Sequence, residues 1–134
     1  MLVEDELSVL EVVRAMLKKL GYYVITAPSG REAIMAYRAN SDNIALVISD
    51  VAMPTMGGDE LLHILAEENP SLKMILMSGY PLQKLQKDPR YADVVVGWLH
   101  KPISLSDLSQ ALDMALSNNQ PAQHNKHKEL AIQK

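Results

Sequence analysis

The chain contains no cysteine, so neither a disulfide framework nor a thiolate metal site can form in it. This absence is compatible with a reducing cytoplasm, where we expect the protein to act. No apolar run approaches the roughly 20 residues that a membrane-spanning helix needs. Residues 1–6 also lack the basic start and the apolar stretch of a secretion signal. We therefore expect no membrane contact from this segment.

The composition is typical of a single globular domain. Of the 134 residues, 48% are hydrophobic and 22% are charged, which is enough for one hydrophobic core. The net charge of -3 is uneven, because residues 118–134 carry three lysines and one glutamate, or +2, which leaves -5 on residues 1–117. Direct nucleic-acid binding needs a clustered basic face, so this acidic body argues against nucleic acid as a partner.

Short apolar runs alternate with helical spacing of apolar residues along the chain. We expect strands at Met1–Val3, Tyr22–Thr26, Ile44–Ser49, Leu72–Met77 and Val94–His100. Helices are expected over about 9–20, 30–39, 61–69, 81–90 and 105–116. Five strand–helix repeats predict an α/β fold, with a five-stranded parallel sheet and helices on both of its faces.

Residues that favour helix ends support these boundaries. Gly21 directly follows the first helical pattern, as a C-terminal glycine does. Ser29 stands three residues before Glu32, and Ser104 stands three residues before Asp107. Both pairs follow the pattern of a side-chain cap at a helix N-terminus, so we expect helices to begin at these serines.

The two ends of the chain depart from the repeat. Residues 118–134 are polar and unpatterned, so we expect a disordered tail or linker after a domain formed by residues 1–117. The first expected strand has only three residues before Glu4, although strands average about five or six residues. Either the chain begins late within its domain, or residues that normally precede this strand are missing from it.

Acidic residues, a hydroxyl and a lysine stand where the apolar runs end. Glu4 and Asp5 follow the first run, Asp50 follows the third, Ser78 the fourth and Lys101 the fifth. The C-terminal ends of parallel strands open on one edge of a sheet, where open α/β sheets bind ligands. We therefore expect these side chains to converge on one shallow acidic pocket, which suits a divalent cation and a phosphoryl group.

The chemistry of these side chains supports that pocket. Carboxylates are hard oxygen ligands, and Mg²⁺ binds one or two of them together with waters and phosphate. Without a cation the carboxylates repel one another, so the pKa of at least one should rise. Lys101 can pair with a phosphoryl oxygen, and Ser78 offers a hydroxyl. Taken singly, the acids read as helix caps, the lysine as solvated surface and the serine as a turn residue.

Four short motifs carry these residues in order along the chain. They are Leu-Val-Glu-Asp-Glu (2–6), Ile-Ser-Asp-Val-Ala-Met-Pro-Thr-Met-Gly-Gly (48–58), Met-Ser-Gly-Tyr (77–80) and Lys-Pro (101–102). Each motif alone is weak, but the ordered set resembles the receiver domain of two-component response regulators along nearly all of residues 1–117. The resemblance implies a flavodoxin-like fold with strand order 2-1-3-4-5.

The resemblance also implies the roles of the acidic residues. Asp50 would be the phosphoacceptor, phosphorylated from the phosphohistidine of a histidine kinase or of a phosphotransfer domain. Asp5 and Asp50 would hold Mg²⁺ directly with the backbone carbonyl of Ala52, and Glu4 would act mostly through a bound water. No enzymatic turnover is implied beyond self-catalysed acceptance and loss of the phosphoryl group.

A conformational switch is implied as well. Ser78 and Lys101 would contact the phosphoryl group and shift with it. Trp98, three residues before Lys101, stands at the family's aromatic switch position, where Tyr or Phe is usual. An acyl phosphate adds negative charge that rearranges its hydrogen-bond partners, which is how a local event becomes a signal.

Two other functions stay open at this point. A metal-dependent phosphatase with an aspartyl nucleophile would need a second carboxylate two residues after Asp50, where this chain has Ala52. A receiver-like binding module would keep the fold without accepting phosphate, although the complete set of site residues argues against it. No glycine-rich P-loop is present, so nucleotide hydrolysis is not expected.

The setting of the domain is also open. It could be a stand-alone receiver, part of a larger regulator or the receiver of a hybrid sensor histidine kinase. The Met-Ser-Gly-Tyr stretch, which runs into a short polar helix, favours the hybrid kinase. The oligomeric state, including a homodimer, is left open.

Overall fold

The computed structural model describes residues 1–89 and 92–117. The predicted tail over residues 118–134 lies outside the described residues and stays a prediction. The described elements, in order, are β1 (Leu2–Val3), α1 (Leu7–Lys19), β2 (Thr26–Ala27), α2 (Gly30–Asn40), the 3₁₀ turn η1 (Ser41–Asn43), β3 (Val47–Asp50), α3 (Gly58–Glu68), β4 (Met74–Ser78), α4 (Leu82–Gln86), β5 (Val95–His100) and α5 (Leu105–Ser117).

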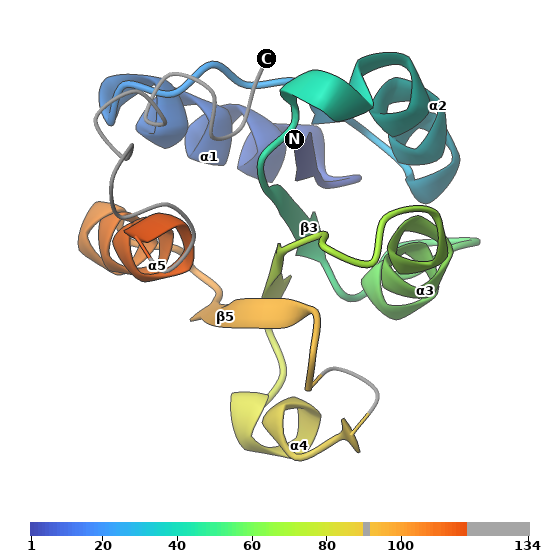
Figure 1. Ribbon diagram of the computed structural model, residues 1–134. Coiled ribbons are helices and arrows are strands. Elements are labelled where there is room, and N and C mark those ends of the chain that lie inside the picture. The colour runs from blue at the N-terminus through green and yellow to red at the C-terminus, as the bar shows by residue number, and fades with distance from the viewer. Residues whose placement is uncertain (90–91, 118–134) are drawn as a thin grey trace.

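The strands form one parallel sheet in the order β2-β1-β3-β4-β5. This order confirms the predicted α/β architecture. Figure 1 shows α1 and α5 on one face of the sheet and α2 and α3 on the other, with α4 beyond the edge formed by β5. Among the described residues, no helix combines the length and the apolar character needed to cross a membrane.

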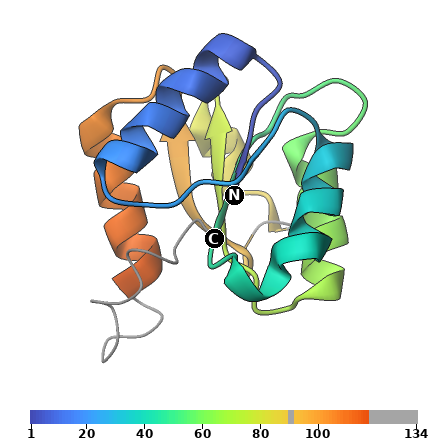
Figure 2. The same ribbon diagram turned by 90° about the horizontal axis from the view of Figure 1, so that it is seen from above.

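Alternation along the strands builds a separate apolar core on each face of the sheet. Ile48, Ile75 and Leu99 pack with α1 and α5, whereas Val47 and Leu76 pack with α2 and α3. Figure 2 shows the sheet between these two pairs of helices. Because both faces are covered, the central strands are buried along their whole length, as their continuous apolar runs predict.

The helix ends form as the sequence predicts. The Ser29 hydroxyl accepts a hydrogen bond from the Glu32 amide at 3.1 Å, and the Ser104 hydroxyl accepts one from the Asp107 amide at 3.0 Å. Gly21 has a φ of 97°, a left-handed conformation that favours glycine, directly after α1.

The predicted bounds of the second strand are wrong, and those of several other elements shift by a few residues, as for α4, which spans Leu82–Gln86 within the predicted 81–90. The expected strand over Tyr22–Thr26 is instead a two-residue strand, Thr26–Ala27. A strand needs a partner along its length, and β1 offers only Leu2 and Val3 for pairing. The residues before Ile25 therefore have no neighbouring strand to bond, despite their β-favouring side chains.

Candidate phosphoryl and metal site

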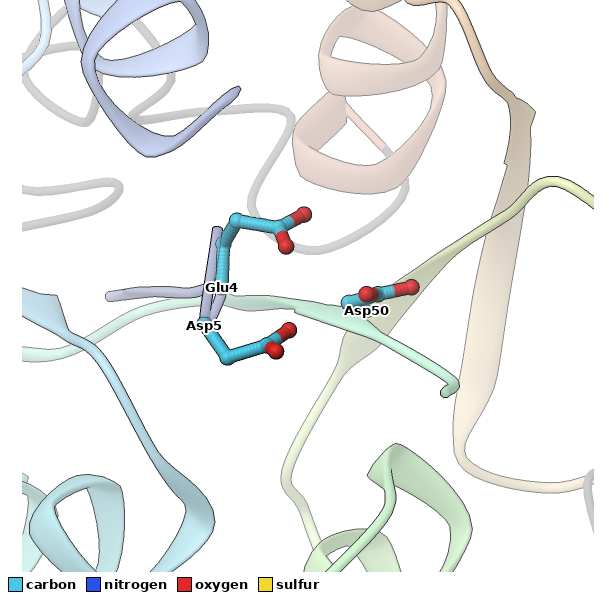
Figure 3. A group of neighbouring side chains, drawn as sticks. All are labelled: Glu4, Asp5 and Asp50. Carbon is cyan, nitrogen blue, oxygen red and sulfur yellow. The ribbon is translucent and has the colours of Figure 1, made fainter. Parts of the chain in front are cut away.

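The predicted convergence of acidic residues occurs at the C-terminal edge of the sheet. Glu4 and Asp5 directly follow β1, and Asp50 is the last residue of the neighbouring strand β3. One carboxylate oxygen from each of the three residues lies within 4.8 Å of the others. Figure 3 shows Glu4 and Asp5 projecting side by side from consecutive residues, toward the strand that carries Asp50.

Lys101 connects the acidic residues of two strands. Its Nζ lies 2.7 Å from Oε1 of Glu4 and 3.0 Å from Oδ2 of Asp50. The sequence predicts that Lys101 lies at this edge, but it did not indicate the pair with Glu4. A buried carboxylate needs a cation or hydrogen bonds, so the pair could have been predicted only if the burial of Glu4 had been known.

Burial sets the electrostatics of Glu4. Its side chain has no exposed surface, and its Oε2 accepts a hydrogen bond from the Glu6 amide at 3.1 Å. Burial raises the pKa of Glu4 and the charge of Asp50 raises it further, against the opposing hydrogen bond from Lys101. For Lys101, burial alone would lower the pKa, but the hydrogen bonds to Glu4 and Asp50 raise it above its ordinary value. The pKa of one carboxyl rises as predicted, but burial is the main cause and the repulsion from Asp50 is a smaller one.

Replacing Glu4 with glutamine should change how stability depends on pH. Because the folded pKa of Glu4 lies above its ordinary value of 4.5, the folded protein binds a proton that the unfolded chain has lost. Glu4 therefore contributes stability that falls as pH rises from 4.5 through the folded pKa. The free energy of unfolding of the parent and of Glu4→Gln can be measured in urea between pH 4 and about 8, without divalent cations. We expect the stability of the variant relative to the parent to increase as pH rises. A difference that is constant with pH would contradict this electrostatic assignment.

Ser78 lies at the end of β4 and is 1% exposed. Its Oγ accepts a hydrogen bond from the Tyr80 amide at 2.9 Å, so the hydroxyl proton can still donate elsewhere. The Ser78 carbonyl accepts a hydrogen bond from the Lys101 amide at 2.9 Å. The ends of β4 and β5 are therefore held together next to the acidic group.

The β3–α3 loop, residues 51–57, folds back over the end of β3. The Ala52 amide donates to Oδ1 of Asp50 at 3.4 Å, and the Gly58 amide donates to the Val51 carbonyl at 2.9 Å. A Cβ on Gly58 would overlap the Asp50 carbonyl oxygen, so only glycine allows this close approach. Gly57 is the N-cap residue of α3 and Gly58 its first residue, and their packing against the end of β3 is visible only in three dimensions.

Trp98 lies on the same sheet but away from the acidic residues. It is half-buried in β5, pairs in register with Leu76 and packs against the core under α2 and α3. It also lines a groove of about 380 Å³ between β5, α4 and α5. Two residues further along the same strands, Ser78 of β4 pairs with His100 of β5. The structure thus connects Trp98 to Ser78 through adjacent strands.

The donor set fits a magnesium ion. Three carboxylate oxygens lie within reach of one centre, and carboxylates with waters are the ligands that Mg²⁺ prefers. Lys101 supplies one positive charge to Glu4 and Asp50, so the three carboxylates exceed that charge and a bound cation would relieve the remaining repulsion. Asp5 and Asp50 would hold such an ion, with Glu4 acting through a water.

A family model described as the response regulator receiver domain matches residues 1–113. The sensor kinase CckA of Brucella abortus is 40% identical over 110 residues, which cover 81% of this chain and 11% of that kinase. The response regulator receiver protein CpdR of the same organism is 31% identical over 119 residues, covering 87% of this chain and 94% of the relative. This chain spans 11% to 29% of the length of the first three curated relatives.

Solved structures agree with this assignment. The crystal structure of the response regulator protein TrrA from Thermotoga maritima, in complex with Mg²⁺ and BeF, superposes with a TM-score of 0.76 at 25% identity. The superposition covers 86% of this chain and 96% of that one. With the sheet order and the acidic edge described above, these matches identify the family: the chain belongs to the response regulator receiver domains of two-component signalling.

Proposed function

We propose that Asp50 accepts a phosphoryl group from the phosphohistidine of a histidine kinase or of a phosphotransfer domain. The observation that carries this proposal is the position of Lys101 Nζ, 3.0 Å from Asp50 and 2.7 Å from Glu4, beside three clustered carboxylates. One nucleophilic carboxylate, one fixed cation and two further carboxylates for a metal are the parts that phosphoryl transfer to an aspartate requires.

In the proposed reaction, an oxygen of Asp50 forms a bond to phosphorus as the bond between phosphorus and the donor imidazole nitrogen breaks. The electron pair of that bond stays on the imidazole ring. Asp50 keeps a small exposed fraction, 7% of its side chain, while its Oδ2 contacts Lys101. Lys101 can then follow the charge from the carboxylate to a phosphoryl oxygen.

A magnesium ion, when bound by Asp5, Asp50 and the Ala52 carbonyl, would neutralise charge on the phosphoryl oxygens. Glu4 would contribute through a water, since its Oε1 is already engaged by Lys101. The complex of TrrA with Mg²⁺ supports this choice of ion for a related protein. A phosphatase of the aspartyl-nucleophile class is disfavoured because Ala52 offers no acid or base.

The signalling step would start at Ser78. Its hydroxyl proton is available to a phosphoryl oxygen, and its strand neighbours lead to Trp98 on β5. We expect Ser78 and Trp98 to shift when Asp50 is phosphorylated, because the added charge needs new donors. The proposal includes a cytoplasmic setting and no turnover beyond loss of the phosphoryl group. The similarity to the sensor kinase CckA, and to the solved receiver domain of the hybrid histidine kinase CckA, supports a hybrid-kinase context.

The proposal is tested by incubating the protein with a small acyl phosphate in Mg²⁺ and measuring intact mass. We expect the parent to gain one phosphoryl group in Mg²⁺ and far less when a chelator removes the ion, because charge neutralisation is lost. A phosphatase would instead consume the donor over many turnovers without accumulating adduct. A binding module would do neither, and either result would reject the proposed phosphoacceptor.

A further inference from the structure

The first residue of α2 makes an unusually close contact with the β3–α3 loop. Gly30 is buried, and a Cβ added to it would lie 2.7 Å from Sδ and 2.9 Å from both Cβ and Cγ of Met56. The Cβ of Met56 is fixed by the backbone, so no rotamer of Met56 alone would clear the overlap. Figure 2 shows this loop passing beside the start of α2. The missing side chain at Gly30 is what allows the loop to close on the helix.

The loop has little freedom between this contact and the sheet. Gly58 is bonded to the Val51 carbonyl at 2.9 Å, which fixes the other end of the loop. The Met56 amide donates to the Pro54 carbonyl at 2.7 Å across Thr55, which has a φ of 70°. A β-branched residue is disfavoured in this left-handed region, so the surrounding contacts must hold the turn in place.

We infer that Gly30 is a positioning residue for the metal site, acting through Met56 on the loop that carries the Ala52 carbonyl. This inference rests on the proposed function, because it assigns a role toward the proposed magnesium ion. Gly30 and Met56 line a cavity of about 360 Å³ together with Asp5, a proposed metal ligand. The loop contact and one proposed metal ligand, Asp5, therefore face the same cavity, while Glu4 and Asp50 are not among its lining residues. A shift of Met56 moves the loop relative to Asp5.

The first test is the affinity for Mg²⁺, measured by titration calorimetry on parent and Gly30→Ala. We expect Gly30→Ala to bind Mg²⁺ about tenfold more weakly, within the range known for residues that support metal ligands. Gly97→Ala is the matched control, since its added Cβ would press on Ile75 of the core at 3.2 Å, away from the loop. The control should keep the parent affinity even where it lowers stability.

A second pair of variants separates the contact from a general effect on folding. Met56→Gly removes the three atoms nearest to the new Cβ, all of them within 2.9 Å, so adding Gly30→Ala on that background should leave Mg²⁺ affinity unchanged. If Gly30→Ala alone fails to fold, recovery of folding and of Mg²⁺ binding in the double variant supports the inference, and failure to recover overturns it. If Gly30→Ala folds and binds Mg²⁺ more weakly than the parent, equal affinities in Met56→Gly and the double variant support the inference, and a further loss in the double variant overturns it.

The outcomes also distinguish the inference from the proposed function. Parent binding with an unchanged Gly30→Ala would overturn the inference and leave the phosphoacceptor proposal standing. Absence of Mg²⁺ binding by the parent would overturn both.

Discussion

Replacing Asp50 with asparagine is expected to abolish the gain of a phosphoryl group from an acyl phosphate. The amide cannot act as the carboxylate nucleophile, and no other described carboxylate contacts Lys101 except Glu4, which is fully buried. The variant should still fold, because Lys101 keeps its ion pair with Glu4 and the acidic cluster loses one repelling charge. Intact-mass measurement after incubation with donor and Mg²⁺ reports the result.

Asp42→Asn is the matched control for Asp50→Asn. Asp42 is an exposed aspartate in the turn after α2, and the same chemical change there should leave phosphoryl gain at the parent level. A stable adduct on Asp50→Asn would mean that the acceptor is another residue. Loss of the adduct in both variants would point to damage unrelated to the nucleophile.

Replacing Lys101 with methionine should have two large effects. Phosphoryl gain should slow by about 100- to 1000-fold, the usual cost of removing one preorganised group that stabilises transition-state charge. The free energy of unfolding at neutral pH should fall by about 3 kcal/mol, because buried Glu4 loses its cation. The loss of stability should shrink as pH falls toward the ordinary pKa of Glu4, since protonation removes the unpaired charge.

Rates of phosphoryl gain and urea unfolding at several pH values measure both effects of Lys101→Met. Lys18→Met, at an exposed position near the end of α1, controls for the loss of one lysine and should match the parent in both assays. A Lys101→Met protein with parent-like rate would remove Lys101 from the proposed mechanism. Parent-like stability would instead show that Glu4 is compensated by other groups.

Much of the fold follows from residue patterns that act locally. The apolar runs of β3 and β4, the capping serines and Gly21 each specify an element without reference to distant residues. The edge at which Asp50 and Lys101 meet follows from parallel pairing alone, since all strands of such a sheet end on the same side. For these features the sequence carries the physical cause directly.

Other features depend on distances that residue types do not encode. β2 is short because β1 offers only two residues for strand pairing. The β-propensity of residues 22–26 does not reveal this limit. The pair between Lys101 and Glu4 joins residues 97 positions apart, and it follows only once Glu4 is known to be buried. The contact of Gly30 with Met56 is likewise a matter of fit between the start of α2 and the β3–α3 loop, and a glycine in the sequence has many explanations.

The most direct measurement of the central claim is a crystal structure of the protein with Mg²⁺ and a beryllofluoride phosphoryl analogue. We predict the ion at about 2.0–2.1 Å from carboxylate oxygens of Asp5 and Asp50 and from the Ala52 carbonyl. The analogue should lie on Asp50, with Lys101 Nζ and the Ser78 hydroxyl bonded to it. An analogue on any other residue, or an ion that Asp5 and Asp50 do not share, would contradict the account.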